Sequence, residues 1–227
     1  MDILAANIDR RLAARILVYV LGLFVLAFGA VFAINSNLGI SPVNSLPFVV
    51  SLITGTDPGF TIAIAFLIFI ALQFVLLRKD LPLINLTQII FALLFGYFVD
   101  AARFIVGSFT IPTYAGQLAM MACSIIFIAF GLSLYMEARL VNMPPEGLVI
   151  AITRKIPGGV FHRVKIVFDC VLVSMSVVLS LIFLGGFDGV REGTIISALM
   201  IGRAIPPARK VVAYILNKLN FYPPEPT

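Results

Sequence analysis

Long apolar runs, each near the length that crosses a bilayer, dominate the chain. A bilayer core of about 30 Å takes roughly 20 apolar residues in a helix. Six runs bounded by charged residues, Gly or Pro meet this requirement. They extend over about Ala14 to Ile34, Phe60 to Leu77, Leu86 to Val106, Gln117 to Glu137, Val164 to Leu184 and Thr194 to Val212. The pattern predicts an all-α polytopic membrane protein with six transmembrane helices.

Two further apolar segments, Pro42 to Thr54 and Pro144 to Lys155, are only about a dozen residues long, which is typical of re-entrant or interfacial helices. Ser41 precedes Pro42 as a candidate N-cap, and Asn44 and Glu146 fall in the first turns of the two segments. Irregular backbone at membrane depth is tolerated where it lines a cavity. Ser41, Asn44 and Glu146 are therefore candidate solute contacts, with helix capping as the alternative role.

The two halves of the chain resemble each other. The stretch FGAVFAINSNLGISPVNSL, which begins at Phe28, aligns without a gap on FGLSLYMEARLVNMPPEGL, which begins at Phe130. After a small length adjustment, NLTQIIFALLFG from Asn85 aligns on REGTIISALMIG from Arg191. The equivalent pairs include Pro42 with Pro144, Asn44 with Glu146, and Gly96 with Gly202. The chain is therefore predicted to contain an internal repeat.

The distribution of basic residues distinguishes two possible topologies, because Lys and Arg accumulate in cytoplasmic loops. If both short segments cross, eight helices result and the positive charge is split between the two sides. If both dip in and return, six helices result and only Arg103 and Arg191 face outward. The cytoplasmic set is then Arg10, Arg11, Arg15, Arg78, Lys79, Arg139, Arg154, Lys155, Arg163, Lys165, Arg209, Lys210 and Lys218. This distribution favours six crossings plus two re-entrant helices.

Three crossings per half is an odd number, so the second half must run upside-down relative to the first. We therefore predict one membrane domain over residues 1–227, with inverted repeats at 14–106 and 117–212. The Pro206-Pro207 pair is predicted to break the last helix. Residues 207–221 alternate basic and apolar faces and are a candidate interfacial amphipathic helix.

Asp169 is the most informative single residue, because it lies inside an apolar run with Lys165 as its basic neighbour one turn away. A carboxylate at such depth is costly and commonly serves a proton relay, an ion site or a buried pair. Arg203 and Asp100 are candidates to pair with each other or with Asp169, either at a solute site or as a structural ion pair. Gln73 is a candidate for the same cavity, with interhelical hydrogen bonding as the alternative.

Composition narrows the class of function. Apolar residues make up 61% of the 227 residues and charged ones 12%, which excludes a soluble domain. The net charge of +5 is scattered among apolar runs, so no nucleic-acid partner is predicted. Cys123 and Cys170 have no metal-ligand spacing, and no catalytic motif surrounds His162. Neither a metal, a cofactor nor an enzymatic activity is expected.

The motifs LG-x-SP-x-N, P-x-E-G-L and GTIISALMIG resemble the YczE/YitT-like family of small bacterial integral membrane proteins. The resemblance covers most of the chain from about Phe28 to Gly202. The sequence departs from that family at Asn44, where an acidic residue is frequent, and at Arg203, where Pro is frequent. The resemblance implies a multi-pass protein of the bacterial plasma membrane, usually described as a transporter or as uncharacterised.

Two functions follow from these features. The first is a carrier or channel for a small polar or charged solute, with a site near the bilayer midplane between the two re-entrant helices and with protons as a possible coupling ion. The rival is a membrane scaffold or accessory subunit that binds a partner protein or a lipid. Both place the chain in the bacterial inner membrane with cytoplasmic termini, and a homodimer is compatible with either.

Overall fold

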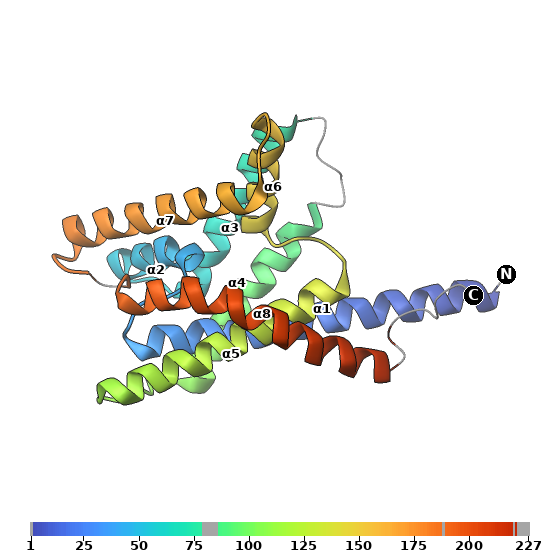
Figure 1. The fold of residues 1–227 in the computed structure, drawn as a ribbon, viewed down its shortest axis with the longest axis horizontal. Helices are drawn as coiled ribbons and strands as arrows, with labels where there is room; N and C mark the ends of the chain where they lie inside the picture. Colours follow the sequence, from blue (N-terminus) through green and yellow to red (C-terminus); the bar gives the residue numbers. More distant parts are fainter. Residues whose placement is uncertain (1, 79–85, 188, 220, 222–227) are drawn as a thin grey trace.

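The computed structural model describes residues 2–78, 86–187, 189–219 and 221, and these residues form eight helices and no strand. Lys79, Asn85 and Asn220, which are part of the predictions above, fall outside the described residues. The helices are α1 (Asp2–Ser36), α2 (Pro42–Thr54), α3 (Pro58–Leu77), α4 (Gln88–Val106), α5 (Tyr114–Ala138), α6 (Pro144–Lys155), α7 (Phe161–Phe183) and α8 (Glu192–Lys218). Figure 1 shows most of the long helices running lengthwise through the molecule.

Five helices are long and apolar enough to cross a membrane, namely α1, α3, α4, α5 and α7. The all-helical prediction is therefore confirmed, and the chain is embedded in a membrane. Both short helices, α2 and α6, also occupy their predicted ranges, because each begins at a proline whose fixed φ and missing N–H suit the first helical position.

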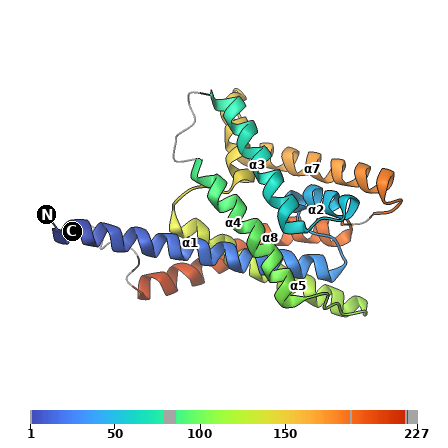
Figure 2. The same ribbon diagram turned by 180° about the vertical axis from the view of Figure 1, so that it is seen from behind.

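Helices α1 and α5 form the central pair and run antiparallel (Figures 1 and 2). Glycines let their backbones touch: a Cβ on Gly131 would lie 2.8 Å from the Gly22 carbonyl oxygen. Seven residues further along α1, the Gly29 carbonyl accepts a 2.7 Å hydrogen bond from Ser124. Small residues at such crossings are the usual device of membrane helices, because backbone proximity maximises van der Waals contact.

The bundle has two opposite ends, which we name after Arg15 and Gly107. At the Arg15 end, the Arg15 guanidinium donates 2.8 Å to the Ala138 carbonyl and also donates to the Arg139 carbonyl, so the apolar span of α1 (Leu12–Ser36) begins where α5 finishes. At the Gly107 end, the Asn35 amide donates 3.0 Å to the Gly107 carbonyl, so α1 finishes where α4 finishes.

The start of α3 also lies at the Gly107 end. The Gly59 amide donates 2.8 Å to Asp100, and Arg103 pairs with Asp57 at 3.4 Å, both near the end of α4. Since α1 finishes and α3 starts at this same end, α2 is entered and left from one side of the bundle.

The remaining helices pack around the central pair. Helix α4 packs on α1 and α8 packs on α5, while α3 packs on α4. Each short helix contacts two long ones: α2 lies against α3 and α7, and α6 lies against the same two helices. Helices α7 and α8 do not pack along each other.

Helix α8 departs from the prediction, because it runs through Pro206 and Pro207 without a break. The two prolines remove the donors for the carbonyls of Gly202 and Arg203, which lie on an exposed part of the helix. The remaining hydrogen-bond ladder continues to Lys218. The predicted break is wrong, and residues 207–218 are not a separate helix.

Candidate functional site

A polar cluster surrounds the start of α6 inside the bundle. Gln73 of α3 and Gln88 of α4 are each only 1% exposed. The Gln73 side-chain amide donates 3.1 Å to the Pro144 carbonyl and 3.2 Å to the Gln88 side-chain oxygen. Its side chain also fills the space beside Gly147, where a Cβ would lie 2.7 Å from the Gln73 oxygen. Gln73 therefore fixes the first turn of α6 against α3.

Glu146 projects from the same turn of α6 toward ionisable residues of α7. Lys165 and Asp169 form a 2.7 Å ion pair on α7, with their side chains 23% and 25% exposed. Glu146 lies within electrostatic range of both members of this pair. Its carboxylate accepts a hydrogen bond from its own backbone N–H, and among the described residues no other donor reaches it. Lys165 thus pairs with one carboxylate and lies within electrostatic range of a second.

Two tyrosines complete this α6 cluster on its other side. Tyr19 of α1 and Tyr135 of α5 are buried, with ring centroids 5.6 Å apart, and both lie within electrostatic range of Glu146. The Tyr19 hydroxyl donates to the Met143 sulfur at 3.7 Å, and its ring lies 4.3 Å from that of Phe91.

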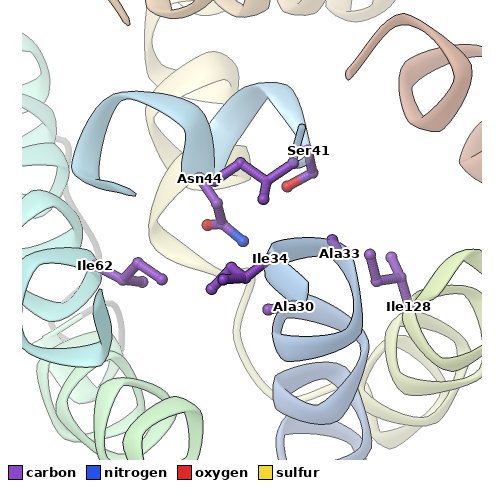
Figure 3. Close-up of a pocket in the computed structure, with 8 residues that line it drawn as sticks. Ala30, Ala33, Ile34, Ser41, Asn44, Ile62 and Ile128 are labelled. Atoms are coloured by element: carbon purple, nitrogen blue, oxygen red, sulfur yellow. The ribbon is translucent and has the colours of Figure 1, made fainter. Parts of the chain in front are cut away.

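The start of α2 lines a different feature, a small pocket between α1, α3 and α5. Figure 3 shows the Asn44 side chain pointing from α2 into this pocket, toward Ile34 of α1. The pocket has room for about one water molecule. Its full lining is Ala30, Ala33, Ile34, Ile40, Ser41, Asn44, Ile62 and Ile128. In the described part of the chain the side-chain amide of Asn44 has no hydrogen-bond partner. The pocket therefore presents a polar group to whatever enters it.

The capping roles considered for the two short helices are not formed. Ser41 occupies the N-cap position of α2 with an extended backbone, yet its hydroxyl makes no capping hydrogen bond. Met143 holds the corresponding position of α6 and has no side chain that could cap. A capping hydrogen bond therefore does not explain why Ser41 and Asn44 are polar, whereas the Glu146 carboxylate does accept from a backbone N–H in the first turn of α6.

Asp100 and Arg203 are not brought to the α6 cluster. Asp100 lies at the Gly107 end, where its carboxylate accepts from the Gly59 amide. Arg203 is exposed on α8 and forms no ion pair with another described residue. The predicted pairing of Arg203 or Asp100 with Asp169 is wrong, because α4 and α8 pack on different members of the central pair and Asp169 is paired with Lys165.

Several polar residues of the interior were missed. Gln88, Tyr19 and Tyr135 each interrupt an apolar run, which is the signal that could have identified them. Glu137, at the end of an apolar run, is only 5% exposed and binds Arg209 of α8. Its burial arises because α8 covers the end of α5, a packing that the order of the helices does not reveal.

Comparison with known proteins gives one match. Residues 13–210 match a family of unknown function, DUF6198. This chain belongs to the DUF6198 family. No curated protein and no solved structure matches it.

The side chains of the α6 cluster can take part in binding and in proton exchange. Among the described residues, no group of three or more His, Cys, Asp or Glu side chains could hold a metal ion. The α6 cluster instead offers two carboxylates, one ammonium, two amides and two phenol hydroxyls around one helix start. Such a set has the groups needed to bind a proton, a cation or a zwitterion, since it contains negatively charged acceptors, a positively charged donor and neutral hydrogen-bonding groups.

Proposed function

We propose that this DUF6198 protein is a transporter, either a carrier or a channel, for a small polar or charged solute. The observation that carries the proposal is the α6 cluster: Gln73, Glu146 and Asp169 converge inside the membrane-embedded bundle, where polar groups are costly. Such residues in transporters commonly mark substrate and proton pathways. The family resemblance in sequence to YczE/YitT-like proteins agrees with this proposal.

The proposed topology has six crossings, with α8 as the sixth, and with α2 and α6 as re-entrant helices. The flanks of α2 both lie at the Gly107 end, as the contacts of Asn35 and Gly59 indicate. At the other end, α5 finishes at Arg15, and α7 begins near Lys165, which lies beside the start of α6. These contacts support a re-entrant path for both short helices, in which each enters and leaves from one side of the membrane.

Helix packing supports an inverted repeat. Exchanging α1–α4 with α5–α8 converts α1·α4 into α5·α8, α2·α7 into α3·α6, and α2·α3 into α6·α7, and all six pairs pack. The equivalent helices α1 and α5 are antiparallel, as inversion demands. The repeat predicted from sequence also aligns Ser45 with Gly147. Ser45 bonds Ser176 at 2.9 Å, and Gly147 touches Gln73, which holds the same position in α3 as Ser176 does in α7.

Charge distribution supports a cytoplasmic Arg15 end and a bacterial plasma-membrane location. Arg15, Arg139 and Arg209 lie at or near this end, whereas the Gly107 end carries the Arg103–Asp57 and Arg191–Glu192 pairs. Basic residues near cytoplasmic membrane ends set the orientation of membrane proteins. Glu146 would then be reached from the cytoplasmic half of the bundle.

Glu146 is proposed as the proton-coupling group. When both carboxylates are ionised, the α6 cluster carries one negative charge in excess over the Lys165 ammonium. A proton on Glu146 or a cationic group of the solute neutralises that excess. Competition or cooperation between proton and solute at one place is the simplest basis for coupled transport.

The test is uptake by proteoliposomes, with a panel of amines, carboxylates and amino acids and an imposed proton gradient. Glu146→Gln is expected to abolish stimulation by the gradient and to lower uptake about tenfold, equal to about 1.4 kcal/mol. The exposed Glu192, paired with Arg191 at the bundle surface, provides the control Glu192→Gln, which should retain full uptake. If the folded wild-type protein moves no member of the panel, the scaffold function replaces this proposal.

A further inference from the structure

One packing contact breaks the symmetry of the two halves. Helices α3 and α4 pack along each other, whereas their repeat equivalents α7 and α8 do not. The α3–α4 contact is closed at both ends, by Gln73 with Gln88 and by Gly59 with Asp100. In Figures 1 and 2, α7 and α8 lie close together at one end and diverge toward the other.

The divergence opens toward the Arg15 end. At the Gly107 end, the segment between α7 and α8 is held to the first half, because Ile40 donates 3.3 Å to the Gly189 carbonyl and Gly193 donates 2.7 Å to the Leu38 carbonyl. Beyond this attachment, α7 follows α2 and α6, while α8 follows α5. Lys165 and Asp169, on the part of α7 nearest the Arg15 end, remain partly exposed.

The residues at the unformed contact are suited to form it. At the α3–α4 crossing, a Cβ on Gly96 would lie 2.7 Å from the Ala63 Cβ, so glycine is required there. The equivalent glycine of α8 is Gly202, which has nothing within 4 Å of the same point. Ile166 holds the position in α7 that Ala63 holds in α3, and it is 61% exposed. Gly202 and Ile166 thus hold the positions equivalent to Gly96 and Ala63 but are kept apart.

We infer that the gap between α7 and α8 is the Arg15-side access to the α6 cluster, and that the protein alternates with a second state in which α7 closes on Gly202 while α3 parts from α4. This inference rests on the proposed transport function and its inverted repeat. In such a repeat the two halves exchange conformations, so the same bundle opens on opposite sides in turn. The α3–α4 contact is then the gate at the Gly107 end.

Gly202→Leu tests the second state directly. The substitution fits the described conformation, because the site is open, but it blocks close approach of α7. We expect unchanged thermal stability and uptake reduced about tenfold or more. Ala71→Leu, on an exposed face of α3, is the matched control and should transport normally. Normal uptake by Gly202→Leu overturns the inference.

Distances measured by spin labels give an independent test in the full chain. The exposed native thiols Cys123 and Cys170 are first replaced by Ser. One label pair then reports α7–α8 (Val167→Cys with Leu199→Cys), and a second reports α3–α4 (Phe60→Cys with Phe104→Cys), all at exposed positions. In nanodiscs each pair should show two distance populations, and adding Gly202→Leu should leave only the wide α7–α8 population.

The outcomes separate this inference from the transport proposal. A single distance for both pairs, together with solute uptake, overturns the alternating gate and leaves transport standing. Two populations without uptake of any solute support the two-state bundle and contradict transport. Two populations that Gly202→Leu reduces to one, with loss of uptake, support both.

Discussion

The two short helices begin alike but face different surroundings. Asn44 of α2 points into a small apolar pocket, whereas its repeat equivalent Glu146 of α6 meets an ion pair and two tyrosines. At three other equivalent positions the residue of the second half is also the more polar one: Lys165 replaces Ile62, Asp169 replaces Phe66, and Tyr135 replaces Ala33. One scaffold thus holds a nearly uncharged site and a charged one.

If the two halves are equivalent, α1 and α5 contribute equally to their crossing. Overpacking the crossing from either helix tests this equivalence and has the largest expected effect. Gly29→Leu and Gly131→Leu place side chains where a Cβ alone would lie within 3 Å of the facing backbone. Each should lower the free energy of unfolding by about 3 kcal/mol. Thermal unfolding in detergent measures this, with Gly202→Leu as the tolerated control. A large loss in only one of the two would show that the crossing is not symmetric.

The charged pair on α7 gives the next largest effect. Lys165→Ile leaves the Asp169 carboxylate without its ammonium partner and should cost about 2 kcal/mol, because the pair is only partly buried. The double variant Lys165→Ile with Asp169→Phe installs the first half's own residues and should recover the stability. It should nevertheless lose uptake. Retained uptake in the double variant would make the ion pair a structural feature only.

The smallest expected effects distinguish the two cross-half contacts of the short helices. Gln73→Leu removes the donor to Pro144 and to Gln88 and should cost about 1 to 2 kcal/mol. Ser176→Ala, at the equivalent position, removes one hydroxyl bond to Ser45 and should cost about 0.6 kcal/mol. Chemical denaturation of both variants ranks them. The reverse order would mean that α2, not α6, is the more firmly held helix.

Local signals were enough to predict the elements. Pro42 and Pro144 fix where the short helices begin, since proline is favoured at a first helical position and the residue before it is driven out of the helix. Apolar run length identified the long helices, because membrane thickness imposes it. The two prolines of α8 were less informative, because they suggested a break that the helix does not have.

Tertiary pairing limited the prediction of the site. Asp169 and Lys165 are one turn apart, so their pairing could be read from sequence. Two other features depend on how helices of different halves cross: Glu146 lies near this pair, and Gln73 binds the start of α6. Arg203 and Asp100 were expected to pair because they occupy nearby places when the two halves are aligned. Positions that are equivalent in two antiparallel halves need not lie side by side in space.

The contacts of Ser45 with Ser176 and of Gln73 with Pro144 mean that the halves are interleaved, each short helix resting on a long helix of the other half. During synthesis, α2 emerges long before α7 exists. Its partner surface is therefore missing while the first four helices insert. Maturation of this protein must include a late docking step inside the bilayer, after the last helices have left the ribosome, as in two-stage assembly of membrane proteins.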